Sequence, residues 1–327
     1  MKKRGIGVGS MWYGIANTAL PNPAAAFIDL LDDGKVLVMT GCVDIGQGSD
    51  TALAQIAAQG IGVPYEDVVC VSTDTNAAPA AGAASASRQT YVGGNAILQA
   101  ARSIRQQVAE FAAGLLECDP TKIDFQGGLV YLDGKEQEIT FAQIVAKATG
   151  QGRMFCATGW FNPDTTGLHP ETCAGKPYAC YAFATQIAQV EVDTETGMIQ
   201  VLDIVAAHDV GRAINPGIIE GQIEGGCCMG LGYGLMEEVI TKKGEIVNPN
   251  LHGYIIPTAM DMPKVHPIIV EDLESTGPFG AKGVGEPTLI PTAAAIANAV
   301  ENAIGIRFYD LPLTPERVLE AIKKHTN

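Results

Sequence analysis

Glu286 is the one acidic residue in a stretch of small and rigid residues, 280–293, which reads GAKGVGEPTLIPTA. Gly283 and Gly285 let the backbone approach a ligand closely or adopt positive φ. Pro287 fixes its own φ and favours an extended conformation at Glu286. A carboxylate held on such a loop, with an apolar helix behind it, is typical of a partly desolvated general base. An acid on an exposed surface loop has the same pattern, so this stretch alone leaves both interpretations open.

Two other stretches combine small residues with the start of a predicted helix. Gly46, Gln47 and Gly48 lie between a predicted strand and an Ala-rich helix. Backbone N–H groups and the positive end of the helix can bind a polar ligand there, although packing of a tight turn gives the same pattern. Residues 77–87 read AAPAAGAASAS and precede a long predicted helix at 94–116. This run is typical either of a flexible linker or of a surface on which a phosphate-bearing ligand lies against bare backbone.

The periodicity of the chain predicts the elements that position these residues. Strands at 24–30 and 35–40 flank a turn, and 183–192 with 198–207 form a hairpin. Helices are predicted over residues 51–61, 94–116, 140–148, 218–238 and 314–323. Segment 150–178 shows no periodicity and is predicted to be a boundary or a long loop.

The glycines at the start of the chain raise a different function, which we discard. Gly5, Gly7 and Gly9 have the spacing that opens a dinucleotide-binding fingerprint, but only four residues precede them. The strand that such a loop must follow is therefore not expected.

Composition narrows the class of protein. The 327 residues carry a formal net charge of −15 and are 47% apolar, which argues against a nucleic-acid or anionic-membrane partner. No apolar run reaches membrane-spanning length and no signal-like apolar segment follows the start, so a cytoplasmic protein is expected. The eight cysteines form no C-x-x-C pair and the five histidines no i, i+4 pair, so no metal ligated by protein side chains is predicted.

Four motifs, taken in order, resemble the molybdopterin-binding domain of the xanthine dehydrogenase/aldehyde oxidase family of molybdenum hydroxylases. They are GCVDIGQG, AAGAASASRQTYVGGN, HDVGRAINP with GQIEGG, and KGVGEPTLIPTAAAIANAV. The resemblance covers nearly the whole chain and is greatest to the nicotinate dehydrogenase branch, in which this domain is divided between two polypeptides. It implies an α+β fold with mixed sheets and packed helices, the C-terminal half of that domain. A first molybdopterin-binding lobe is expected at 1–150, a connecting loop at 151–178, and a second lobe with the catalytic glutamate at 179–327.

The resemblance also implies roles for individual residues. Glu286 is the expected catalytic base, and Tyr13 is expected to line the substrate pocket, with a core tyrosine beside Trp12 as the alternative. The family pattern does not predict Arg88, which leaves the contacts around it open. The expected cofactor-binding residues are Gly46, Gln47, Gly48, Ala83, Ala84, Ser85, Ala86, Ser87, Asp209 and Gln222.

The implied activity is that of one subunit in a molybdenum-dependent hydroxylase complex, which converts nicotinate to 6-hydroxynicotinate with water as the oxygen source. The expected cofactor is molybdopterin cytosine dinucleotide, whose own sulfurs hold the molybdenum. The expected partners are a large molybdopterin subunit that supplies the missing half-domain, an iron–sulfur subunit and an FAD subunit. A purine, an aldehyde or an aromatic thioester as substrate, and a non-catalytic nucleotide-binding scaffold subunit, are the alternatives.

Overall fold

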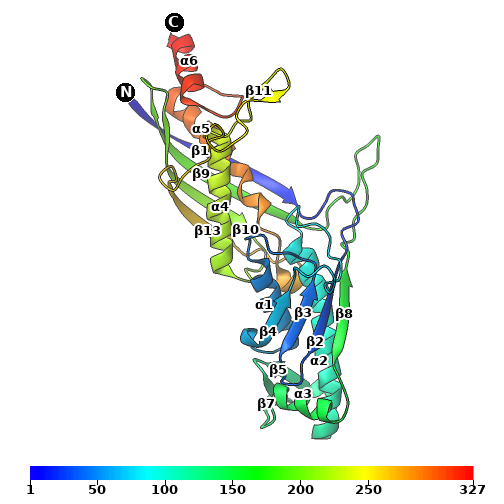
Figure 1. Ribbon diagram of the computed structural model, residues 1–327. Helices are drawn as coiled ribbons and strands as arrows, with labels where there is room; N and C mark the ends of the chain where they lie inside the picture. Colours follow the sequence, from blue (N-terminus) through cyan, green and yellow to red (C-terminus); the bar gives the residue numbers. More distant parts are fainter. Residues whose placement is uncertain (327) are drawn as a thin grey trace. The chain divides into compact units, whose positions relative to one another are not determined.

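The computed structural model describes residues 1–326, and the chain divides into two compact units (Figure 1). Unit 1 consists of Met1–Tyr13, Tyr181–Asp272 and Val284–Asn327, and unit 2 consists of Gly14–Cys180 and Leu273–Gly283. The units therefore alternate along the chain, whereas the two predicted lobes follow one another in sequence. That each predicted lobe binds molybdopterin stays a prediction.

A four-stranded sheet in the order β1-β9-β10-β13 lies at the centre of unit 1. Its strands are β1 (Lys2–Gly14), β9 (Tyr181–Asp193), β10 (Ile199–Asp209) and β13 (Lys264–Val270). The antiparallel pair β9 and β10 confirms the predicted hairpin, and β13 runs parallel to β10. Every second residue of β9 from Ala182 to Val192 is buried, because successive side chains of a strand point to opposite faces.

Three helices complete unit 1: α4 (Pro216–Leu235), α5 (Ile290–Ile304) and α6 (Pro315–Thr326). In Figure 1, α4 lies beside β10 and β13, and α5 lies close to β1 and β9. The hydroxyl of Thr314 accepts a hydrogen bond from Arg317 N at 3.4 Å, which confirms the predicted start of α6. A short hairpin, β11 (Thr241–Lys242) and β12 (Glu245–Ile246), follows α4. The core between sheet and helices contains Val190, Ile204, Ile223, Ile296 and Val300.

The three glycines at the start of the chain lie within β1 itself and not in a loop that follows a strand, which agrees with discarding the dinucleotide fingerprint. A Cβ on Gly5 would lie 2.1 Å from Ala299 O, and one on Gly9 would lie 2.3 Å from Pro291 O. A Cβ on Gly7 would lie 2.1 Å from Ala299 N. The glycine side of β1 therefore lies directly against the backbone of α5, an approach that only glycine permits.

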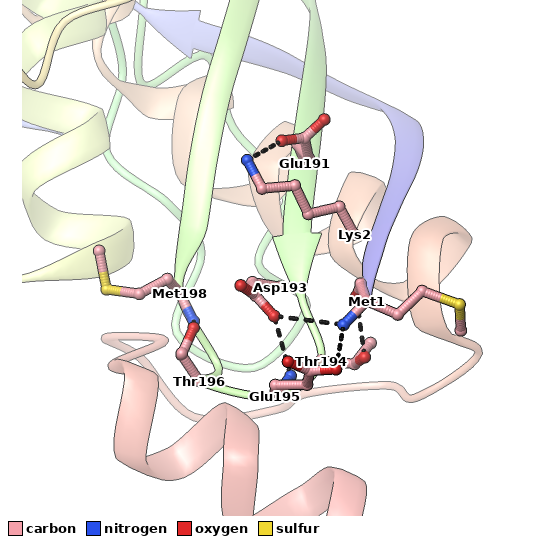
Figure 2. Close-up of polar contacts among 8 residues, drawn as sticks. All are labelled: Met1, Lys2, Glu191, Asp193, Thr194, Glu195, Thr196 and Met198. Carbon is pink, nitrogen blue, oxygen red and sulfur yellow. Dashed lines mark hydrogen bonds and ion pairs between the residues drawn. The ribbon is translucent and has the colours of Figure 1, made fainter.

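The first residues of β1 are attached to the turn between β9 and β10 (Figure 2). The backbone N–H and the hydroxyl of Thr194 both donate to Met1 O, at 3.0 and 2.8 Å. Lys2 Nζ lies 2.8 Å from Glu191 Oε1, but the lysine side chain is largely exposed, so this ion pair contributes little stability. The hydrogen bonds of Thr194 are the more specific contact.

A second four-stranded sheet, in the order β4-β3-β2-β8, lies in unit 2. Its strands are β2 (Ala24–Leu30), β3 (Val36–Thr40), β4 (Val68–Val71) and β8 (Cys156–Phe161). β2 is antiparallel to β3 and β8, and β3 is parallel to β4. Strand β8 lies within the segment that was predicted to be a loop. That prediction was wrong here because only Gly159 of β8 is fully buried, which leaves no apolar alternation to detect.

The helices of unit 2 are α1 (Ser49–Ile61), α2 (Gly94–Leu116) and α3 (Phe141–Gly150). A three-stranded sheet of β5 (Ile123–Gln126), β6 (Leu129–Leu132) and β7 (Lys135–Glu136) completes it. The apolar residues of α2 at helical spacing are buried from Ile97 to Val108, whereas Phe111 is half-buried and Leu115 is exposed. The fold is α+β, with mixed sheets and packed helices. Among residues 1–326, no helix is both long and apolar enough to cross a membrane.

Candidate active site

Glu286 begins a single 3₁₀ turn, Glu286–Thr288, directly before α5. This turn differs from the extended conformation that Pro287 predicts, because Thr288 closes it: the Thr288 hydroxyl donates to Gly285 O at 2.6 Å. The N–H of Leu289 donates to Glu286 O at 3.3 Å. The Glu286 side chain is exposed, so the described residues do not provide the burial expected of a general base.

The hydroxyl of Tyr13 donates a hydrogen bond to Glu286 Oε2. Tyr13 lies half-buried near the end of β1, 273 residues away in sequence. The structure therefore brings the residue predicted to contact substrate together with the residue predicted to be the base. A hydrogen bond from a neutral hydroxyl to a carboxylate is stronger than one between neutral groups and gives the carboxylate a defined orientation.

Three residues of α4 that are four apart in sequence, Gln222, Gly226 and Gly230, lie against the Glu286 turn and the start of α5. A Cβ on Gly226 would lie 2.1 Å from Thr288 Oγ1, and one on Gly230 would lie 2.4 Å from Thr292 Cβ. Gln222, one turn earlier, has its Oε1 3.5 Å from the place of a Cβ on Gly285. The structure thus places Gln222, a predicted cofactor residue, beside the turn that carries Glu286.

A buried polar cluster, which sequence reasoning missed, lies next to the same turn. It consists of Gln186, His208, Thr288 and Thr292, whose exposed fractions are 0, 2, 0 and 0%. Gln186 Nε2 donates to Thr288 O at 2.7 Å and lies 3.0 Å from His208 Nε2. The Thr292 hydroxyl donates to Gln186 Oε1 at 2.6 Å. A glutamine at an inward position of β9 is the sequence signal that could have revealed the cluster.

Burial lowers the pKa of His208 to about 4. The imidazole is therefore neutral near pH 7, and its Nε2 accepts from the Gln186 amide, because an amide nitrogen only donates.

Acid should therefore destabilise the protein through His208. In the unfolded chain this histidine binds a proton below its ordinary pKa of 6.5, whereas in the folded chain it stays neutral until about pH 4. The unfolded state binds more protons in this window, so stability falls as the pH falls from 6.5 towards 4, by roughly 2 kcal/mol at about pH 5. Urea unfolding at about pH 7.5 and about pH 5 measures the loss. His208→Gln should remove it and His252→Gln, at an exposed position, should not; an equal loss in all three proteins would contradict the assignment.

Asp209, a predicted cofactor residue, follows His208 at the end of β10 and is 8% exposed. Its Oδ1 accepts from Gly211 N at 3.0 Å, where Gly211 adopts a φ of +61°. In unit 1 Asp209 therefore stabilises the turn that leaves β10.

In unit 2, the predicted ligand turn at Gly46 to Gly48 is organised by a carboxylate that was not predicted. Asp44 Oδ1 accepts from Gly46 N at 2.7 Å and from Gly48 N at 3.4 Å, and Asp44 Oδ2 accepts from Asp50 N at 3.2 Å. Burial opposes ionisation of Asp44, but these backbone hydrogen bonds outweigh it and lower its pKa. Residue 48 is the N-cap of α1 and makes no side-chain cap bond, so Asp44 takes that role by accepting from Asp50 N in the first turn.

Gln47 itself makes four hydrogen bonds within unit 2. Its Nε2 donates to Gln89 Oε1 at 2.6 Å, to Ser49 Oγ at 2.9 Å and to Val43 O at 3.1 Å. Its Oε1 accepts from Ile45 N at 2.7 Å. Gln89, which was not predicted, is buried and lies two residues after the end of the small-residue run. The structure thus connects the Gln47 turn to the end of that run.

Residues 83–87 present small side chains and left-handed backbone. Ala83 and Ala84 are exposed, and Ser85, Ala86 and Ser87 are half-buried. Ala86 and Ser87 have φ of +53° and +52°, which costs a residue other than glycine roughly 1–2 kcal/mol each. Strain of this kind persists where the surroundings impose it, and it is concentrated at functional sites.

The buried side chain of Arg88 is hydrogen-bonded to the backbone of the small-residue run 77–87. It is 2% exposed, and its guanidinium donates to Ala81 O, to Ala83 O at 3.3 Å, and to Asn22 O and Pro23 O at 2.8 Å. Its Nε has no hydrogen-bond partner among the described residues. A run tied to a buried guanidinium at two carbonyls is not the flexible linker that composition also allowed.

Comparisons with known proteins identify the family of the chain. The family model described as "Molybdopterin cofactor-binding domain" matches residues 1–263. The chain is 34% identical to the xanthine dehydrogenase molybdenum-binding subunit of Escherichia coli O157:H7, over 97% of this chain and 42% of that protein. It is 32% identical to the 6-hydroxypseudooxynicotine dehydrogenase complex subunit gamma of Paenarthrobacter nicotinovorans, over 87% of this chain and 36% of that protein.

Among solved structures, quinoline 2-oxidoreductase from Pseudomonas putida 86 matches with a TM-score of 0.87 and 32% identity, over 99% of this chain and 42% of that chain. The chain thus spans about two-fifths of the length of the relatives it matches. On these findings, the chain belongs to the molybdopterin cofactor-binding domain family of the molybdenum hydroxylases.

Proposed function

We propose that this chain binds a molybdopterin cofactor and supplies Glu286 as the base of a molybdenum hydroxylase that acts on an N-heteroaromatic acid. The observation that carries the proposal is the Glu286 carboxylate, which receives the Tyr13 hydroxyl and lies on a turn closed by Thr288. A non-catalytic scaffold has no need to orient one exposed acid in this way. Family membership supports the cofactor, and the oriented carboxylate supports the base.

The residues of unit 2 fit an anionic cofactor best at 83–87. Small side chains leave the backbone open there, Ser85 and Ser87 are half-buried, and the buried Arg88 guanidinium donates to the carbonyl of Ala83. The N–H groups of Gly46 and Gly48 donate to Asp44. The Gln47 amide is engaged as well, with Val43, Ser49 and Gln89, so a ligand at that turn would have to replace contacts that the turn already makes. Within residues 1–326, no cluster of three or more His, Cys, Asp or Glu side chains is arranged to hold a metal. A metal carried by the pterin itself is consistent with this donor set.

The reaction we propose is nicotinate plus water giving 6-hydroxynicotinate, two electrons and two protons. When bound, the molybdenum cofactor supplies the oxygen transfer and accepts the two electrons. Glu286 Oε1 or Oε2 takes one proton as the new carbon–oxygen bond forms at a ring carbon beside nitrogen. Tyr13 orients the carboxylate through its hydroxyl, and Gln222 lies beside the Glu286 turn, where its amide can bind the cofactor.

The class of substrate is supported by the names of two relatives. Xanthine and quinoline, named for the relatives from E. coli and P. putida, are nitrogen heteroaromatics. The carboxylate of nicotinate needs a cation, for which arginine is the usual partner. Arg88 already donates to four carbonyls, and Arg212 lies exposed with its Nε 4.0 Å from Glu271. We therefore propose that a partner subunit supplies the carboxylate anchor.

We further propose the cytosine dinucleotide form of the cofactor, a large subunit supplying the other part of the domain, and iron–sulfur and FAD subunits that carry the electrons away. The lengths of the relatives support the first partner, because each extends well beyond the part that this chain matches. A cytoplasmic location fits this assembly and belongs to the same proposal.

Purification of the native complex through an affinity tag on this chain tests the proposal. We expect molybdenum in the complex, release of cytidine monophosphate on acid hydrolysis, and ¹⁸O from labelled water in 6-hydroxynicotinate. A complex without molybdenum would overturn the proposal. A loaded complex that oxidises xanthine or an aldehyde but not nicotinate would overturn the substrate alone.

The Tyr13 hydroxyl should matter for turnover rather than for binding. Tyr13→Phe removes the hydrogen bond to Glu286 and is expected to lower kcat roughly tenfold or more, since a bond to a charged group contributes about 1.5–3 kcal/mol. KM and molybdenum content should stay near wild type. Tyr233→Phe, at an exposed position of α4, is the matched control and should change neither. A raised KM with unchanged kcat would instead indicate that Tyr13 contributes to substrate binding.

A further inference from the structure

The cluster of Gln186, His208, Thr288 and Thr292 is unusual for the centre of a protein because all four side chains are polar and almost completely buried. They come from β9, from the end of β10 and from the two sides of the junction between the Glu286 turn and α5. A cluster of polar groups in a core is expensive unless every member is satisfied. Its position next to the turn suggests that it has a function beyond packing.

The amide of Gln186 uses both of its N–H donors and its carbonyl oxygen inside this cluster. An amide has two N–H donors and a carbonyl acceptor. The donors are directed at Thr288 O and His208 Nε2, and the carbonyl accepts from Thr292. The amide nitrogen cannot accept a hydrogen bond. A proton on His208 Nε2 would therefore force the amide to rotate and would break its bond to Thr288 O.

These bonds fix both ends of the segment that carries the base. On the N-terminal side of Glu286, Gly285 O accepts a hydrogen bond from the Thr288 hydroxyl. On the C-terminal side, Thr288 O accepts a hydrogen bond from Gln186 Nε2. The α4 backbone at Gly226 approaches Thr288 so closely that the turn cannot move towards α4. The segment is thus held by hydrogen bonds on one side and by close packing on the other.

We propose that Gln186, hydrogen-bonded to His208, is a positioning residue that holds the Glu286 turn in its reactive conformation. The role in turnover rests on the proposed function, whereas the restraint on the turn does not. Catalytic groups need their supporting side chains to be held as firmly as they are themselves, and displacement of a reacting group by about 1 Å can cost on the order of 100-fold in rate.

The test is Gln186→Met, which keeps the length and apolar volume of the side chain but removes the amide. In the purified native complex, hydrogen exchange of residues 284–289 should become roughly tenfold faster or more, and kcat should fall about 10- to 100-fold. KM and molybdenum content should stay near wild type. Gln189→Met is the matched control, because Gln189 lies in β9 at a position that is not fully buried and not in the cluster; it should change none of these values.

A second pair of variants covers the case in which Gln186→Met does not assemble. Thr288→Ser keeps the hydroxyl that donates to Gly285 O and should retain wild-type exchange and kcat. Thr288→Val removes it and should reproduce the Gln186→Met result. Unchanged exchange in both Gln186→Met and Thr288→Val would overturn the restraint, and faster exchange with unchanged kcat would overturn the positioning role. If the wild-type complex lacks molybdenum, the proposed function fails and exchange alone decides whether Gln186 holds the turn.

Discussion

Replacing Glu286 with glutamine should leave a complex that assembles with its molybdenum but turns over 10²- to 10⁴-fold more slowly. Glutamine has nearly the same shape and can still accept from the Tyr13 hydroxyl through its carbonyl. What it loses is the ability to take a proton. The change therefore isolates the chemical role of the carboxylate from its structural one.

Steady-state kinetics with nicotinate, paired with molybdenum analysis of the same preparation, provides the measurement. Glu245→Gln, in the exposed strand β12 of the same unit, is the control for removal of one negative charge and should keep wild-type kcat. A fully loaded Glu286→Gln complex with near wild-type kcat would remove Glu286 from the mechanism. Loss of molybdenum in that variant would instead indicate a role in holding the cofactor.

Gly226→Ala should be among the most disruptive single-methyl changes in unit 1. The added Cβ would lie 2.1 Å from Thr288 Oγ1, which is held by its hydrogen bond to Gly285 O, and 2.7 Å from the backbone atom Thr288 C. Overpacking of this kind costs roughly 1–3 kcal/mol, and more where backbone must move. Because Thr288 closes the Glu286 turn, kcat should fall along with stability.

The neighbouring position provides the matched control. A Cβ on Gly225 meets nothing within 4 Å, and Gly225 is exposed on the same helix. Gly225→Ala should therefore raise stability by up to about 1 kcal/mol through helix propensity alone. Urea unfolding of the two variants compares them directly. If both alanines stabilise the protein equally, the close contact between α4 and Thr288 does not exist in solution.

The parts of this fold that sequence predicts best are those with strong local signals. The β9–β10 hairpin alternates apolar residues along two long strands, and α2 repeats them at helical spacing, so both elements were predicted within a few residues. Glycine is a poor helix former, so glycines within the predicted helix 218–238 are a signal of close packing, and Gly226 and Gly230 do lie closely against Thr288 and Thr292. The Gly/Pro stretch around Glu286 indicated a constrained turn, although its 3₁₀ form depends on a hydroxyl two residues later.

The parts that sequence could not provide depend on tertiary contacts or on polar groups in apolar positions. The hydrogen bond between Tyr13 and Glu286 spans 273 residues, and nothing local to either residue predicts it. Gln186 was missed because a polar residue in a strand is ordinarily assigned to the solvent side, whereas here its amide is satisfied inside the core. The Asp44 carboxylate was missed because a helix cap is ordinarily expected at the residue directly before the helix, whereas Asp44 lies five residues before α1 begins.

The glycine side of β1 has a consequence for how the chain reaches its native state. β1 and β9 are far apart in sequence, and pairing of distant strands forms slowly. A strand shifted by one residue turns its other face inward, which would force Ile6 or Val8 into the backbone of α5, where even the Cβ of a residue at 5, 7 or 9 has no room. The wrong register is therefore excluded by steric overlap rather than by a lost attraction. Three residues without side chains thus protect the chain from misfolding, independently of any stability they contribute.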